Sequence, residues 1–353
     1  MRLKSKLLIF AFLLLLSAAS WAKDHDVSHD KQTIPQKDIK TEIKEFITHH
    51  LQDTHDFHLT KGASFPLPVI LWDNGLQIFS SSKFHHGETV AEYNANFYKI
   101  YHGKIYKTDP EGTIIYDDEH RVINEKPLDF SITKNVSFIL IVSLLMMWMF
   151  SRMAKSYKTN SIPKGIGRFL EPIILYIRDD IARPNIGEKH YKRYMGFLLT
   201  VFFFIWIINL LGLTPLGVNV TNNIAVTFSL AIMTYLITTF SGNKHYWKHI
   251  FWMPGVPAPM RVILAPIELL GTIIKPFSLM IRLYANITAG HVVLMSIIGL
   301  MFIFKNWIGS PLSFGLAFAL ALLELLVAAL QAYIFTMLSA LYFGSAVEEH
   351  HDH

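Results

Sequence analysis

Two apolar segments near the C-terminus carry polar side chains of types that could move an ion. Arg282 and His291 lie in the stretch IRLYANITAGHVV, and Glu324 and Gln331 lie in ELLVAALQAYIF. Inserting an arginine at the centre of a bilayer costs at least ~2.5 to 3.5 kcal/mol, so charged groups there mark ion paths or have buried partners. A histidine and a carboxylate at one depth can relay protons. These residue types therefore predict ion transfer within a membrane.

The spacing of these residues sets which of them can meet. If the two segments form an antiparallel helical hairpin, His291 matches Glu324 in depth, and Arg282 matches Gln331. At about 100° per residue, Arg282 and His291 lie on opposite faces of their helix, and Asn286 lies on the side of Arg282. No carboxylate of the chain is placed at the level of Arg282, so we expect its counter-charge to come from another subunit. The alternatives are a structural ion pair for His291 with Glu324, and helix-packing hydrogen bonds for the two amides.

The composition indicates a membrane protein with one sizeable aqueous part. Hydrophobic residues make up 52% of the 353 residues, and cysteine is absent, which excludes disulfides and thiolate sites. The net charge of +5 is concentrated in particular loops, and no aromatic-basic stripe indicates nucleic-acid binding.

The N-terminal third predicts an exported domain. Residues 1–22 have the basic start, apolar run and small residues of a secretory signal peptide, with an uncleaved anchor helix as the alternative. Residues 23–133 are polar and contain ten of the 17 histidines; they predict an amphipathic helix over 38–51 and a β-meander after Gly62. The histidines lack the spacing of metal ligands, so we expect a solvated surface and no metal site.

The remaining chain predicts the spans. Residues 134–152 form a first span, and residues 153–193 form a cytoplasmic loop by the positive-inside rule, because residues 152–193 carry ten Lys/Arg against four Asp/Glu. An amphipathic stretch in that loop predicts an interfacial helix, although a docking surface for a soluble partner has the same pattern. Residues 194–243 hold the second and third spans, and residues 244–261 form another cytoplasmic loop.

The last apolar region, residues 262–347, is too long for two upright spans. We predict a re-entrant or kinked segment with breaks at Pro266 and Pro276, followed by a tilted antiparallel hairpin, and then a tail over 348–353. The fold predicted is an all-α polytopic membrane protein with about five spans and a small N-terminal periplasmic α+β domain. The C-terminus is expected in the cytoplasm.

The same motifs resemble a known family. PIELLGTIIKPFSLMIRLYANITAGH (266–291) and ELLVAALQAYIFTMLSALY (324–342) closely resemble the membrane subunit a of F-type ATP synthases, and the resemblance covers roughly residues 131–347. Its most specific part is the arginine in RLxxNxxAG, which follows KPxSL. The resemblance implies a stator in the bacterial inner membrane that holds its hairpin against a rotating ring of c subunits. It also implies the b-subunit stator stalk and the remaining ATP synthase subunits as partners.

The resemblance implies a role for each polar residue. Arg282 faces the essential carboxylate of the ring, drives its deprotonation and blocks leak between two aqueous half-channels. His291 and Glu324 line the periplasmic half-channel, although some members carry these two residue types in the reverse order. Gln331 and Asn286 match polar positions near the arginine.

Other positions are less well defined by the resemblance. Glu268 and Lys275 match an upstream Glu and Lys of the family, on the ion path or in folding. Gly212 and Asn223 stand where some relatives have acids, and most bacterial members lack the exported domain.

We expect no cofactor and no ATP chemistry on this chain, because it has no GxxxxGK[ST] phosphate loop. The transported ion is expected to be a proton, with sodium left open. A secondary transporter is the first rival, and the absence of a second RLxxNxxAG region weighs against it. A membrane-embedded protease would need an HExxH, Ser/His or paired-Asp site, and the sequence has none of these.

Overall fold

The computed structural model describes residues 53–60, 63–87, 89–159, 165–214, 218, 220–253, 256–303 and 307–348. The predicted signal peptide over 1–22 and the predicted helix over 38–51 lie outside these residues. All described residues belong to one of the two units into which the chain divides, Ile43–His353.

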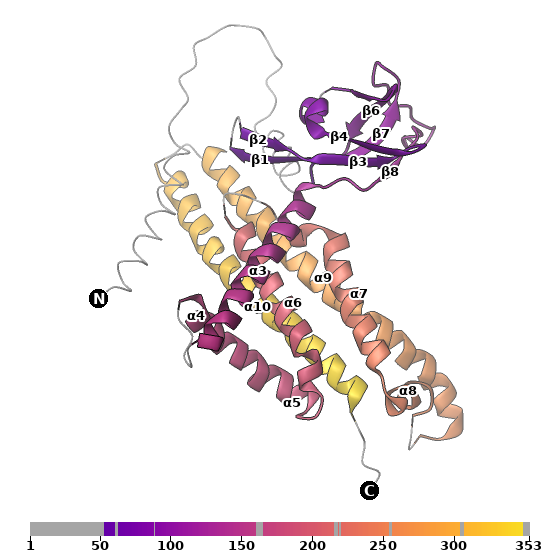
Figure 1. The fold of residues 1–353 in the computed structure, drawn as a ribbon, viewed down its shortest axis with the longest axis vertical. Helices are drawn as coiled ribbons and strands as arrows, with labels where there is room; N and C mark the ends of the chain where they lie inside the picture. Colours follow the sequence, from indigo (N-terminus) through magenta and orange to yellow (C-terminus); the bar gives the residue numbers. More distant parts are fainter. Residues whose placement is uncertain are drawn as a thin grey trace. The chain divides into compact units, whose positions relative to one another are not determined.

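Eight short strands follow one another before the first long helix, in three antiparallel sheets (Figure 1). One sheet pairs β1 (Asp56–Thr60) with β2 (Ala63–Pro66), and a second has the order β4 (Leu76–Ser80), β3 (Pro68–Trp72), β8 (Leu128–Asp129). The third sheet is a meander of β5 (Ala91–Tyr93), β6 (Asn96–Tyr101) and β7 (Lys104–Thr108), and the 3₁₀ helix η2 (Ser81–Gly87) lies between β4 and β5.

Alternating apolar residues build the core of this part of the chain. The largest members are almost wholly buried: Leu71, Phe84, Tyr98 and Ile105. The buried Asp73 carboxylate accepts hydrogen bonds from Tyr98 Oη at 2.9 Å and Lys107 Nζ at 2.8 Å. The hydrogen bond from Lys107 lowers the pKa of Asp73 below its ordinary value.

The β-meander predicted after Gly62 includes the stretch TIIYDD (113–118), and no strand forms over these residues in the structure. Only an isolated bridge, Tyr116 to Val122, forms there. The Asn124 side chain accepts from the backbone N–H of Ile115 and donates to the carbonyl oxygens of Thr113 and Lys107. Because one amide satisfies these backbone groups, the segment needs no ladder of strand hydrogen bonds.

Five helices of the described chain are long and apolar enough to cross a membrane. They are α3 (Lys134–Thr159), α6 (Tyr191–Gly212), α7 (Ile224–Ser241), α9 (Ala258–Ile303) and α10 (Gly309–Val347) (Figure 1). The shorter elements are α4 (Ile166–Tyr176), the π-helical segment η3 (Ile177–Ala182), α5 (Arg183–Ile186), η4 (Val220–Asn222) and α8 (Lys244–Phe251). The prediction of about five apolar spans is confirmed in length and composition.

The helix breaks predicted at Pro266 and Pro276 do not occur. Both prolines lie inside α9, which runs without interruption for 46 residues. The re-entrant or kinked course through the membrane stays a prediction. A proline removes one backbone hydrogen bond, and neighbouring helices in a membrane protein can compensate for that loss. The first span is also longer than predicted, because α3 continues past Arg152 to Thr159. The sequence analysis missed α8, whose N-cap Asn243 accepts a hydrogen bond from the backbone N–H of Tyr246.

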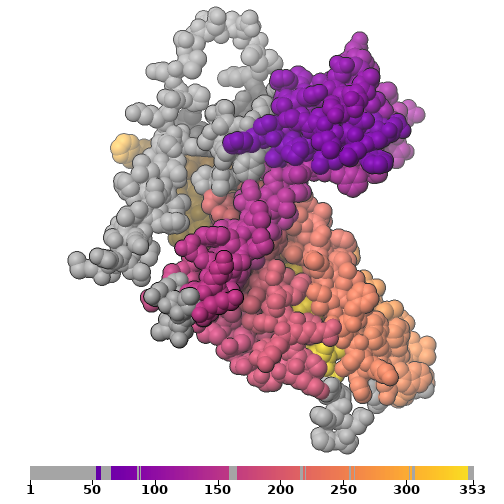
Figure 2. All heavy atoms as spheres, viewed as in Figure 1, coloured from indigo at the N-terminus to yellow at the C-terminus, as the bar shows by residue number. Residues whose placement is uncertain are grey.

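The helical core is centred on α6, which contacts α3, η3 and α10. The Tyr194 ring of α6 stacks on the Phe343 ring of α10 at 4.8 Å between centroids. The amphipathic stretch predicted in the loop, residues 166–181, is buried at one end and exposed at the other. Ile177 and Ile181 are fully buried, whereas Phe169 is 63% exposed. By contrast, α7 and α9 lie at the surface in Figure 2 (salmon to orange) and expose apolar side chains such as Phe240, Val262 and Ile267.

Candidate functional site

A buried acid–base pair joins α9 to α10. His291 Nδ1 lies 3.9 Å from Glu324 Oε1, and the two side chains are only 12% and 10% exposed. Gly290 makes this approach possible, because a Cβ atom at that position would lie 2.5 Å from Glu324 Oε1. Glu324 Oε2 is buried and accepts no hydrogen bond from the described residues. The pair therefore combines a titratable imidazole with a carboxylate oxygen available for a further partner.

Polar side chains continue from this pair towards α6. The Thr288 hydroxyl, one turn before His291, lies 2.5 Å from Asn222 Oδ1 in η4 and 2.7 Å from the carbonyl oxygen of Tyr284. Next to Asn222, the buried Thr221 hydroxyl donates to Asn209 Oδ1 of α6 at 2.9 Å. The sequence analysis missed these residues. Two signals were present: the polar turn TPLGVNVTNN, and Thr288 at a spacing of three from His291.

Arg282 is half-buried and lies apart from this pair on α9. Within the described residues it forms no ion pair with a carboxylate and no hydrogen bond with Gln331, although its charge acts on Tyr342 of α10. Gln331 is only 3% exposed, whereas Asn286, one turn from Arg282, is exposed. The structure thus brings His291 and Glu324 together but joins neither amide directly to Arg282.

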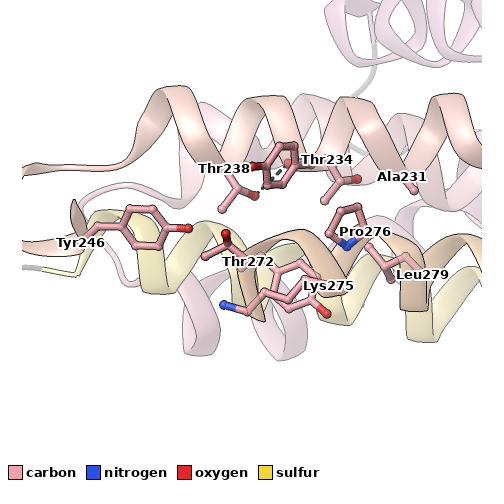
Figure 3. Close-up of a pocket in the computed structure, with 10 residues that line it drawn as sticks. Ala231, Thr234, Thr238, Tyr246, Thr272, Lys275, Pro276 and Leu279 are labelled. Atoms are coloured by element: carbon pink, nitrogen blue, oxygen red, sulfur yellow. Dashed lines mark hydrogen bonds between the residues drawn. The ribbon is translucent and has the colours of Figure 1, made fainter. Parts of the chain in front are cut away.

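A second polar region contains Lys275 (Figure 3). Thr234 and Thr238 of α7 face Thr272 and Lys275 of α9 across a small pocket, whose lining also includes Tyr246 of α8 and Tyr342 of α10. Lys275 Nζ lies 5.5 Å from the centre of the Tyr342 ring. Burial raises the pKa of Tyr246, and the nearby charge of Glu268 adds to that effect. Glu268 is half-buried and does not line this pocket. Of the two charged residues that precede Arg282 in the family motif, Glu268 and Lys275, only Lys275 therefore reaches the pocket.

The candidate site combines three kinds of group. Arg282, a permanent cation, lies on one face of α9, an imidazole–carboxylate pair lies between α9 and α10, and hydroxyl and amide groups lead away from that pair. The described part of the chain contains no group of three or more His, Asp or Glu able to hold a metal ion.

Comparison with known proteins shows to which family the chain is similar. The family model of the ATP synthase A chain matches residues 136–344, and a model described as a domain of unknown function matches residues 46–130. ATP synthase subunit a of Chloroherpeton thalassium is 43% identical over 233 residues, which cover 64% of this chain and 69% of that protein.

Two further relatives agree with this match. ATP synthase subunit a of Chlorobium phaeobacteroides (strain DSM 266) is 40% identical over 279 residues, covering 76% of this chain and 79% of the relative. The subunit a of Myxococcus xanthus is 42% identical over 232 residues, covering 64% and 76%. Residues 136–344 include all but the first two residues of α3 and the last three of α10, the whole of α6, α7 and α9, and every polar residue of the candidate site. The chain therefore belongs to the ATP synthase A chain family, the membrane subunit a of the ATP synthase, whose ATP chemistry is carried by other subunits.

Proposed function

We propose that this chain carries protons through the membrane along two aqueous half-channels and that Arg282 separates them. In this proposal His291 and Glu324 belong to the half-channel on the periplasmic side, and a ring of c subunits turns against α9 and α10. The b-subunit stalk and the remaining ATP synthase subunits hold the chain still. The domain before α3 is periplasmic and the C-terminus is cytoplasmic, as the basic loops favour.

The observation that carries the proposal is the His291–Glu324 contact at 3.9 Å between two largely buried side chains. A structural ion pair needs only mutual neutralisation, and here Glu324 Oε2 lacks a partner among the described residues. An imidazole exchanges protons near neutral pH, so a histidine beside a carboxylate suits a relay. This favours a proton over sodium as the transported ion.

Arg282 supports the proposal through its lack of a counter-charge. A guanidinium stays protonated at any physiological pH, and leaving it unpaired in lipid is unfavourable. No carboxylate of the described chain pairs with Arg282. A carboxylate carried by the ring would neutralise it during part of each turn. The fixed positive charge would meanwhile repel protons that try to cross directly.

The second half-channel is assigned to the region around the pocket in Figure 3. Lys275 lies seven residues before Arg282, which places both on one side of α9 about two turns apart. The hydroxyl groups of Thr234, Thr238 and Thr272 could hold water there. Glu268, about two turns before Lys275 in α9, would act at the opening towards the cytoplasm. Gln331 and Asn286 would line the space near the arginine.

The test is Arg282→Ala in the assembled ATP synthase, with Arg261→Ala as the matched control. Arg261 lies on the same helix, donates to the carbonyl oxygen of Val256 at 2.6 Å and stacks on Trp252. We expect Arg282→Ala to abolish ATP-driven proton pumping in membrane vesicles while the c ring still co-purifies with the chain. The control should retain most of its pumping. Full pumping by an assembled Arg282→Ala enzyme would refute the role of Arg282.

A further inference from the structure

The sheet β4-β3-β8 is apolar on both faces. Its inner face contributes Val69, Leu71 and Phe79 to the buried core. On the outer face, Trp72 lies opposite Leu76 on β4 and Leu128 on β8. The next row has Ile70 opposite Ile78, with Phe130 on the other side, where its N–H donates to the carbonyl oxygen of Ile70 at 2.9 Å. Directly opposed residues of antiparallel strands point to the same face.

The outer face is exposed and carries no charge. Its side chains are exposed as follows: Trp72 55%, Leu76 56%, Ile78 50%, Leu128 63% and Phe130 64%. The third row consists of Pro68, Ser80 and Ile132, so no ionisable residue interrupts the surface. We call these residues the outer apolar face. A contiguous apolar surface of this kind marks a contact with a partner or with a membrane.

We propose that the outer apolar face rests on the lipid surface at the end of the membrane where α3 begins. Phe130 is four residues from Lys134, the first residue of α3, so the chain between them reaches at most about 14 Å. This connection has little slack, because Ser131 Oγ accepts from the backbone N–H of Ile70 and the N–H of Ile132 donates to the carbonyl oxygen of Pro68. The edge strand of the face therefore leads directly into a helix that is long and apolar enough to span the membrane.

The residue types on the face favour lipid over a protein partner. Trp72 and Phe130 are aromatic, and tryptophan concentrates at membrane–water interfaces where an apolar body meets polar headgroups. Neighbouring strands lie about 4.8 Å apart, so β3 and β4 remain close to β8, the strand that leads into α3. The competing occupant is a protein segment, such as residues 38–51 of this chain or another ATP synthase subunit.

This chain has no native cysteine, so a single introduced cysteine is its only thiol label site when it is tested in the assembled ATP synthase. Single variants Ile78→Cys and Ser80→Cys place a nitroxide label on the outer apolar face, and Glu92→Cys on β5 is the exposed control. Ser80→Cys replaces a small exposed residue, so it retains the test if Ile78→Cys disturbs folding. The enzyme is reconstituted into vesicles of phosphatidylcholine and phosphatidylglycerol. Collisions of the label with oxygen, which concentrates in lipid, are compared with collisions with a water-soluble nickel chelate.

We expect the ratio of oxygen to nickel collisions to be at least threefold higher at Ile78 and Ser80 than at Glu92. Equal ratios at all three positions would overturn the proposal in favour of a face in water. Low collision rates with both reagents at Ile78 and Ser80 would overturn it in favour of a protein occupant. Neither result depends on whether Arg282 is required for pumping.

Discussion

Replacing Gly290 with alanine should disturb proton transfer while leaving assembly intact. The new Cβ would lie 2.5 Å from Glu324 Oε1, whereas ordinary contact begins at 3.4 Å, so the carboxylate must retreat by about 0.9 Å. It is the end of a flexible side chain and can move without shifting the backbone. An alanine also favours the helix by roughly 0.5–1 kcal/mol relative to glycine, which offsets the strain. We therefore expect little change in stability.

The expected loss is in passive proton flux. Displacing a reacting group by about 1 Å can reduce a rate by about 100-fold. We expect Gly290→Ala to lower passive flux through the reconstituted membrane sector roughly 10- to 100-fold, measured as the pH change that a potassium diffusion potential drives. Gly271→Ala on α9 is the matched control, because nothing lies within 4 Å of a Cβ atom there. Equal flux in the two assembled variants would show that the position of the Glu324 carboxylate is unimportant.

Three further predictions follow from other contacts. Exchanging the pair, His291→Glu with Glu324→His, should restore more proton flux than either single change, and a double variant no better than the singles would reduce the pair to packing. Thr288→Val should lower passive flux several-fold, because it removes the hydroxyl beside Asn222. The control Thr200→Val loses only an exposed hydrogen bond to the carbonyl oxygen of Gly196 and should leave the flux unchanged. Because the folded pKa of Asp73 is lowered, its contribution to stability is present above its unfolded pKa of about 3.9 and is lost as pH falls below it. The protection factors of amides in β3 and β6 of the whole enzyme, which correct the observed exchange rates for the intrinsic rates at each pH, should therefore fall on acidification, and Asp73→Asn should weaken that dependence.

The sequence predicted the helices well wherever apolar length decides the structure. Helix α6 begins three residues before the predicted start at 194, α7 ends two residues before the predicted end at 243, and α10 ends at the predicted residue 347. A long run without charges favours a buried or lipid-facing helix. Depth matching across the two last segments also predicted that His291 would meet Glu324, and the structure brings them together.

Predictions that depended on single residues were less successful. Proline normally ends a helix in water, yet Pro266 and Pro276 lie inside α9. The prediction failed because proline's effect on a helix depends on the surrounding helices, which the local sequence does not show. The Thr288–Asn222 contact joins residues 66 positions apart, and no periodicity in either segment indicates it. The strand predicted over 113–118 failed because one side chain, Asn124, takes the backbone hydrogen bonds instead.

The π-helical segment η3 has a consequence for how this chain tolerates insertions and deletions. A π turn holds about one residue more than an α turn, so losing one residue between Ile177 and Ala182 would restore regular winding and leave the segment that follows in nearly the same orientation. Asn185, whose carbonyl oxygen touches the bare backbone of Gly344, would then keep its place against α10. Relatives should therefore tolerate a gap of a single position here as long as they keep glycine at the position of Gly344.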